Sequence, residues 1–251
     1  MRIATRSAVL FAAVVMLALP LGIARAQLTT EPIQGHYADQ SGGLNLVAGK
    51  DQGKSATNAL TTIYDNTSST ALFGVSSTDL ASIWGDELLT TGTGLLSTHK
   101  FTLFNGSSSG NLLTCTVSVS FFDAMTSAPL GGYSTNINFG AGLPPGFFST
   151  ITVAGLDPLL IVFSTTDLVV TQRITAKTGP ATRLGIASLS PPLIGSSPTS
   201  MYISSSTIGG GVPGFYTFTA GNADPGHFLA VNPPPVGTTS KSWGTLKKLY
   251  R

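Results

Sequence analysis

The chain has 251 residues, of which 42% are hydrophobic and only 10% are charged. Ser (28) and Thr (33) together make up about a quarter of the chain, and 29 Gly and 15 Pro add turn-forming positions. So few charges exclude a coiled coil, and the lack of a Gly periodicity excludes collagen. Because the hydrophobic content suffices for a core, the sequence predicts a turn-rich, all-β globular protein.

The first 26 residues have the three-part pattern of a secretory signal. A short basic start precedes the uncharged run 8–19, and Ala24-Arg25-Ala26 places small residues at the cleavage positions. We therefore expect cleavage between Ala26 and Gln27. The run is shorter than the roughly 20 residues that span a bilayer, which favours a cleaved signal over a membrane anchor. No second apolar run is long enough to span, so we expect no transmembrane segment after cleavage. The predicted location is extracellular or at the cell surface, with the periplasm as the alternative.

The charge left after cleavage excludes one class of partner. Residues 27–240 contain 6 basic and 11 acidic side chains, a net charge of −5, while four further basic residues lie in the last eleven positions. Nucleic-acid binding requires a basic patch that neutralises phosphates. We therefore expect no nucleic-acid partner.

Residues 27–62 are polar and rich in Gly, which indicates a loose leader or irregular edge strands. From residue 63 to residue 232, short apolar runs, several of them alternating with period two, are separated by Gly and Pro turn signals. The expected strands are Glu87–Thr90, His99–Phe104, Leu112–Phe122, Phe148–Val153, Leu159–Phe163, Leu168–Ala176, Arg183–Leu189, Met201–Ser204, Tyr216–Thr219 and His227–Val231, with one helical turn at Thr78–Trp84. About ten short strands predict an all-β fold, an antiparallel β-sandwich of jelly-roll type.

Residues 233–251 form a Pro-rich spacer and a basic-aromatic C-terminal tail. If the tail is helical, its aromatic and Leu side chains lie on one side and its cations on the other. Two interpretations stay open: a tail that packs Trp243 on the sandwich, or a sorting or attachment signal. The residues that would carry such a signal are Trp243, Leu246, Lys247, Lys248, Tyr250 and Arg251.

Four short motifs in the body resemble a known family. They are Ile63-Tyr64-Asp65-Asn66-Thr67, Trp84-Gly85-Asp86-Glu87-Leu88, Lys100-Phe101-Thr102-Leu103-Phe104-Asn105, and the stretch from Gly185-Ile186-Ala187 to Pro191-Pro192-Leu193-Ile194-Gly195-Ser196-Ser197. In this order they resemble secreted bacterial β-sandwich proteins of unknown function, many of which end in a PEP-CTERM sorting segment. The resemblance covers roughly residues 62–232 and implies no established catalytic residues. This chain lacks the Pro-Glu-Pro motif of that segment, so the Trp243–Arg251 tail is the candidate to serve instead, one of the two open interpretations of the tail.

Two Gly-containing motifs invite a catalytic or phosphate-binding interpretation. Gly106-Ser107-Ser108-Ser109-Gly110 matches the G-x-S-x-G nucleophile pattern, but that elbow needs a helix after it. Here a strand is predicted to follow, which favours a hairpin loop. Gly209-Gly210-Gly211-Val212-Pro213-Gly214 has G-x-G-x-x-G spacing without the helix that binds phosphate, which favours a flexible loop.

The titratable residues show no ligand-like spacing. His36, His99 and His227 are far apart, so zinc or a triad would require the fold to gather them. Asp86 and Glu87 are adjacent and would point to opposite faces of a strand, so an acid pair would need Asp65, Asp123 or Asp224 as a partner for one of them. Calcium is the alternative use of such oxygens, with Asn222, Asp224 and backbone carbonyls as ligands. We expect no cofactor, with calcium as that alternative.

The aromatic residues and the cysteine complete the candidates. Tyr64, Trp84, Tyr133, Tyr202 and Tyr216 could form a sugar-stacking platform, although core packing is the default for rings within apolar runs. Tyr133, after two glycines, is the ring we expect to be exposed. Cys115 is the only cysteine, so no intramolecular disulfide can form, and its alternating context predicts a small buried side chain.

These observations lead to one main hypothesis about function. The sequence favours a secreted, non-enzymatic β-sandwich with a structural, adhesive or surface-associated role. The alternative is a carbohydrate-binding module, assisted by calcium or not, and a third, less favoured hypothesis is a hydrolase. The expected partners are extracellular polysaccharide or cell-surface components, and the oligomeric state is not determined by the sequence.

Overall fold

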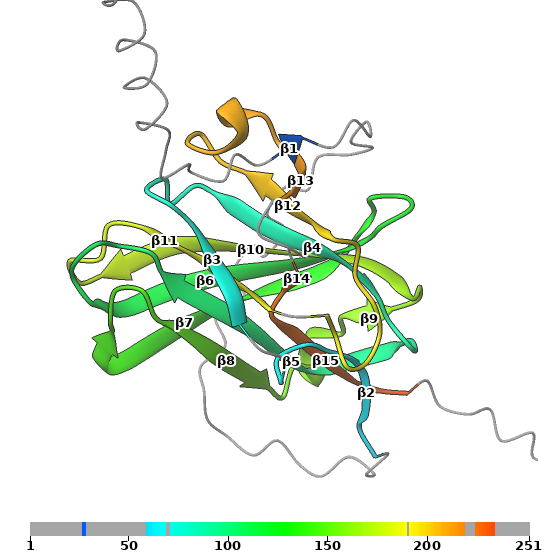
Figure 1. The fold of residues 1–251 in the computed structure, drawn as a ribbon. Helices are drawn as coiled ribbons and strands as arrows, with labels where there is room; N and C mark the ends of the chain where they lie inside the picture. The colour runs from blue at the N-terminus through cyan, green and yellow to red at the C-terminus, as the bar shows by residue number, and fades with distance from the viewer. Residues whose placement is uncertain (1–26, 29–58, 69–70, 190, 219–223, 234–251) are drawn as a thin grey trace, which may run out of the picture.

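Two antiparallel β-sheets make up the part of the chain that the structure describes (Figure 1). The structure is a computed structural model, and it describes residues 27–28, 59–68, 71–189, 191–218 and 224–233. The predicted all-β, antiparallel sandwich is confirmed. The jelly-roll connectivity stays a prediction.

The first sheet has seven strands in the order β1-β13-β12-β4-β10-β6-β7. Their bounds are β1 Gln27–Leu28, β13 Gly214–Thr217, β12 Ser200–Ser204, β4 Ile83–Leu89, β10 Asp167–Thr178, β6 Leu112–Asp123 and β7 Pro129–Leu143. The second sheet has eight strands, and its main path is β14-β11-β5-β15-β2, with β3 paired to β11 and both β8 and β9 paired to β5. These strands are β14 Asp224–Pro225, β11 Leu184–Leu189, β5 Gly94–Asn105, β15 His227–Asn232, β2 Thr61–Asp65, β3 Ala71–Ser77, β8 Phe148–Ala154 and β9 Val162–Phe163.

Strand β6 shows how the sequence forms these sheets. Its alternate residues Cys115, Val117, Val119 and Phe121 are buried in the main core cluster. The residues between them are mostly Thr and Ser, which point to the other face because successive side chains of a strand alternate. The main core holds side chains of both sheets, so the sheets pack through their apolar faces.

The loop between β5 and β6 connects the two sheets. Asn105, fully buried at the end of β5, donates from Nδ2 to the carbonyls of Gly110 and Leu143, both at 2.9 Å. Its Oδ1 accepts the N–H of Ser107 at 3.1 Å. The G-x-S-x-G segment is therefore part of a sheet-to-sheet crossing, and the expectation of a hairpin loop was wrong.

Other differences from the predicted elements have local causes. In place of the helical turn expected at Thr78–Trp84, a single turn is closed by the Ser82 N–H and the Asp79 carbonyl at 3.1 Å, and from Ile83 the chain is strand β4, because Trp84, Asp86 and Leu88 alternate into the interior. The strand expected at 159–163 is divided into a 3-10 turn, Asp157–Leu159, and the two-residue β9, since Pro158 and the left-handed Leu160 (φ 55°) interrupt it.

Four strands were not predicted, and several strands are longer than expected. Strands β2, β3, β7 and β14 were missed, and β5, β6 and β10 have 12 residues each. Strand β7 has 15 residues but is rich in Gly, Ser and Asn, so it has no apolar run to reveal it. Within the segment 27–62, Gln27–Leu28 pairs with β13 and β2 begins at Thr61.

Candidate functional site

The fold brings together one of the acid pairs that the sequence left open. Asp86 lies on the inner face of β4, fully buried, and Glu87 points to the opposite face, as expected. Asp224 on β14 is also buried, and its charge raises the pKa of Asp86 after the larger effect of burial. Asp65 and Asp123 instead accept hydrogen bonds from nearby threonines in turns. Because both carboxyls of the Asp86–Asp224 pair are closed off from solvent, a substrate has no access to it.

Two of the three histidines also meet in the core. Nδ1 of His99 lies 2.7 Å from the Tyr133 hydroxyl, and its Nε2 lies 3.1 Å from Nδ1 of His227. Burial lowers the pKa of His227 to about 3. Burial, followed by the neighbouring His227, lowers the pKa of His99 well below its ordinary value. His36 lies outside the described residues, and within them no three His, Cys, Asp or Glu side chains gather as a metal site.

The serine motif has a structural use. The Ser107 hydroxyl accepts the N–H groups of Thr182 (2.8 Å) and Arg183 (3.0 Å) and donates to the Arg183 carbonyl. Ser108, the central serine of the motif, is exposed, and β6 rather than a helix follows the loop. The geometry of a nucleophile elbow, a strand–turn–helix, is therefore missing at this segment.

The sugar-stacking platform proposed from the aromatic residues is wrong. All five candidates are buried: Tyr64, Trp84, Tyr133, Tyr202 and Tyr216. Tyr133, expected to be exposed, has no exposed surface, because β7 directs its ring into the core, where its hydroxyl meets His99. The glycines before it shape the strand and do not place the ring on the surface.

The remaining sequence candidates are structural where they are described. Gly209–Gly211 forms a 3-10 turn whose backbone accepts the Tyr216 hydroxyl. Cys115 is a free, buried thiol, as predicted, and burial raises its pKa to about 12.

Several predictions fall on residues that the structure does not describe. Ala26, Asn222 and the tail residues Trp243, Leu246, Lys247, Lys248, Tyr250 and Arg251 lie outside the described part, and of Gln27 only the backbone pairing in β1 is described. Within the described residues, no helix is long and apolar enough to cross a bilayer.

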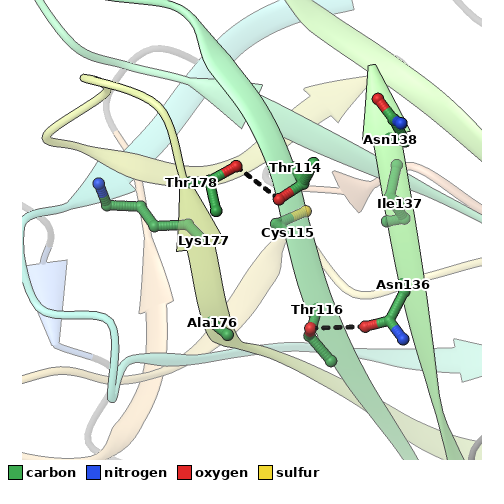
Figure 2. A pocket seen from close by; sticks show the side chains of 9 residues that line it. All are labelled: Thr114, Cys115, Thr116, Asn136, Ile137, Asn138, Ala176, Lys177 and Thr178. Carbon is green, nitrogen blue, oxygen red and sulfur yellow. Dashed lines mark hydrogen bonds between the residues drawn. The ribbon is translucent and has the colours of Figure 1, made fainter. Parts of the chain in front are cut away.

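A pocket lies across strands β6, β7 and β10 of the seven-stranded sheet, at the end where β10 and β7 flank β6 (Figure 2). It has a volume of about 400 Å³. The residues that line it come from one short segment of each strand: Thr114, Cys115, Thr116, Asn136, Ile137, Asn138, Ala176, Lys177 and Thr178. Because Cys115 and Ile137 belong to the core cluster, their neighbours Thr114, Thr116, Asn136 and Asn138 face outward.

Polar side chains that line the pocket form pairs between neighbouring strands, as Figure 2 shows. The hydroxyls of Thr114 and Thr178 are 2.6 Å apart, and the Thr116 hydroxyl donates to Oδ1 of Asn136 at 2.7 Å. The pairing registers of both neighbouring strands shift close by, between Ile174 and Ala176 on one side and Leu112 and Thr114 on the other. Such irregularities bend a sheet and redirect its side chains.

The chemistry of the pocket is neutral and polar. Hydroxyl and amide groups both donate and accept hydrogen bonds, and each keeps capacity beyond the pair it already forms. Lys177 is the only charged lining residue, and its Nζ donates to the Gly179 carbonyl. Sequence reasoning missed this site because it missed β7, although the alternation Asn136-Ile137-Asn138 beside the Thr114-Cys115-Thr116 run was a usable signal.

Comparison of the chain with protein-family models, with curated proteins and with solved structures finds no match. The resemblance to secreted β-sandwich proteins therefore stays a prediction.

Proposed function

We propose that this chain is a secreted, non-enzymatic β-sandwich with an adhesive role at a cell surface or in an extracellular matrix, and that it holds neutral polysaccharide at the pocket on β6, β7 and β10. The observation that carries the proposal is the outward-facing set of hydroxyl and amide groups in that pocket. Sugar hydroxyls need partners that both donate and accept, and Thr and Asn side chains supply both.

The non-enzymatic part of the proposal is supported by where the reactive groups lie. The Asp86–Asp224 pair and the His99–His227 pair are buried, and the Ser107 hydroxyl bonds to the backbone. Each of these groups is buried or bonded to the backbone, which supports the view that none is available to a polymer at the surface.

This mode of binding differs from the aromatic platform that the sequence suggested. Polar pairs on a sheet face give modest affinity per site, because each hydrogen bond exchanged with water adds only about 0.5–1.5 kcal/mol. Adhesion by many copies of such a site does not need tight single sites. In this proposal the predicted signal peptide directs export, and the Trp243–Arg251 tail holds the chain at the surface.

Retention of the purified full chain on a panel of insoluble polysaccharides tests the proposal. We expect retention on at least one neutral polymer, both in calcium and in EDTA. The double variant Thr114→Val/Thr178→Val removes two hydroxyls at constant shape and should weaken retention roughly tenfold.

The matched control is Thr150→Val/Thr152→Val, which removes two exposed hydroxyls from β8 in the other sheet. This control should bind like the unmodified chain. If no neutral polymer retains the protein, or if both double variants bind equally well, the pocket is not the binding site and the proposal fails.

A further inference from the structure

A second polar cluster lies in the interior, where β4 of one sheet faces β14 of the other. Asp86, between Trp84 and Leu88 on the inner face of β4, has no exposed surface. Its Oδ1 accepts the Ser197 hydroxyl at 2.9 Å. Its Oδ2 has no hydrogen-bond partner among the described residues.

Two further oxygens in this cluster share that condition. Oδ1 of Asp224, a residue that is 1% exposed, and the Tyr64 hydroxyl have no hydrogen-bond partner within the described structure. The three residues are close enough to act on one another: after burial, the charges of Asp86 and Asp224 raise the pKa of Tyr64. Burial raises the pKa of Asp224 to about 6, whereas the Ser197 hydroxyl, which lies near both Asp224 and the Tyr64 hydroxyl, lowers the pKa of both groups.

The charge of this cluster is not balanced by a nearby base. The charged groups that act on Asp86 are the acids Asp224 and Glu87, and no described Lys or Arg is among them. Burying an unpaired carboxylate is strongly unfavourable, and every buried oxygen without a partner adds a further cost. One oxygen of each carboxyl group and the Tyr64 hydroxyl, from three separate strands, therefore lack a partner, and the Ser197 hydroxyl already donates to Asp86.

A proton can satisfy only part of this arrangement. One proton shared by the two carboxyls joins a single pair of oxygens and leaves the Tyr64 hydroxyl without a partner. A divalent cation neutralises both carboxylates at once. It also accepts several oxygen ligands together, because Ca²⁺ takes six to eight of them in flexible geometry.

We propose that Asp86, Asp224, Ser197 and Tyr64 form a buried binding site for a hard divalent cation, Ca²⁺ in an exported protein, and that the ion fastens β4 and β14 across the sandwich. Asp86 and Asp224 are the charged ligands, and the Ser197 and Tyr64 hydroxyls are neutral ones. The site is structural and independent of polysaccharide binding at the surface pocket, so either proposal can fail alone.

Thermal unfolding of the full chain at about pH 7.5, first in EDTA and then with about 10 mM CaCl₂, tests the site. We expect Ca²⁺ to raise Tm by about 5 °C or more, since a ligand that binds only the folded state stabilises it. Asp86→Asn should abolish this response. In EDTA the same variant should be at least as stable as the unmodified chain, because it no longer buries an unpaired charge.

The matched control is Asp123→Asn, which makes the same substitution in a surface turn and should keep the full Ca²⁺ response. A second measurement does not depend on stability: Tb³⁺ bound at the site should emit on tyrosine excitation, and excess Ca²⁺ should remove that emission. Tyr64→Phe should reduce it, and Asp86→Asn should abolish it.

Two results would overturn the proposal. One is a Tm that Ca²⁺ leaves unchanged, together with a loss of Tm between about pH 7.5 and about pH 5 that is larger in Asp224→Asn than in the unmodified chain, which would mean that the carboxyls hold a proton. The other is Tb³⁺ emission that Asp86→Asn leaves unchanged, which would place the ion elsewhere.

Discussion

The buried histidine pair makes a quantitative prediction about stability in acid. His99 and His227 have almost no exposed surface, and their rings are joined through Nε2 and Nδ1 at 3.1 Å. Both rings can be neutral if the hydrogen bonds run in one direction: the Tyr133 hydroxyl donates to Nδ1 of His99, and Nε2 of His99 donates to Nδ1 of His227. A proton added to either ring would place an unpaired charge in the core.

The sign of the effect follows from the direction of the pKa shifts. An unfolded histidine titrates near 6.5, whereas burial lowers the pKa of His227 in the folded protein to about 3. As the pH falls, the unfolded chain therefore takes up protons first. The folded protein therefore keeps its full stability above about pH 6.5 and loses stability as the pH falls toward the pKa of His227 in the folded state.

The magnitude can be worked out for one histidine. A differential proton changes the free energy of unfolding by about 1.36 kcal/mol per pH unit, so lowering the pH from about 7 to about 5 costs about 2 kcal/mol for His227, whose pKa in the folded protein is about 3. His227→Gln keeps an amide that can bond to His99 but removes one titration. Its loss of stability over this interval should be about 2 kcal/mol smaller than that of the unmodified chain.

Urea unfolding of both proteins at about pH 7, 6 and 5 measures this difference. Asp86 and Asp224 have raised pKa values and act in the opposite direction, but they are present in both proteins and cancel in the comparison. Tyr133→Phe is the control: it should lower stability by about 1–3 kcal/mol at each pH and keep the pH dependence. Equal pH dependence of the unmodified chain and His227→Gln would refute the inference that His227 is neutral in the fold.

Three further predictions concern packing and buried groups. At Gly185 an added Cβ would lie 1.8 Å from the carbonyl of Val75, so Gly185→Ala should lower the free energy of unfolding in urea by about 3 kcal/mol or more. The control Gly92→Ala, whose Cβ meets only a side chain at 3.3 Å, should cost under about 1 kcal/mol. Equal costs would contradict the packing of β3 on β11. The Cys115 thiol, whose pKa burial raises to about 12, should react with a thiol reagent at about pH 8 only after unfolding, and rapid labelling of the native protein would show that the β6–β7 layer opens. Asn66→Ala should lower the free energy of unfolding by about 2–4 kcal/mol in the same urea assay, because the Asn66 side chain accepts the His227 N–H at 2.6 Å and donates to the Pro225 carbonyl at 2.8 Å. A loss below about 1 kcal/mol would mean that other groups replace these two hydrogen bonds.

The strands that could be predicted are those whose own residues carry the pattern. Strand β6 was expected at Leu112–Phe122 and runs from Leu112 to Asp123, because Cys, Val and Phe alternate there with Thr and Ser. Strand β7 was missed because its inward positions are few and its glycines weaken the signal. Trp84 was assigned to a helical turn since the start of β4 has a mixed composition, and only packing against β10 and β12 makes it a strand.

The candidate sites were predictable only in part. The alternation of side chains correctly predicted that Asp86 and Glu87 lie on opposite faces of a strand and that Cys115 is buried. Which acid would stand beside Asp86 was open among three residues, and the fold selected Asp224. The prediction that Tyr133 is exposed was wrong, because neighbouring glycines do not indicate which side of a strand faces the core.

By itself the sequence determined the properties that depend on composition and on neighbours along the chain: an all-β class, antiparallel pairing and an interior built from alternating residues. Only the tertiary structure decided which distant residues meet, such as His99 and His227, which are 128 positions apart. The physical reason is that alternation is a local steric property of each strand, whereas the partner of a buried polar group depends on how two sheets stack. The placement of the polar groups in the core, and of the pocket at the meeting of three strands, follows from that stacking.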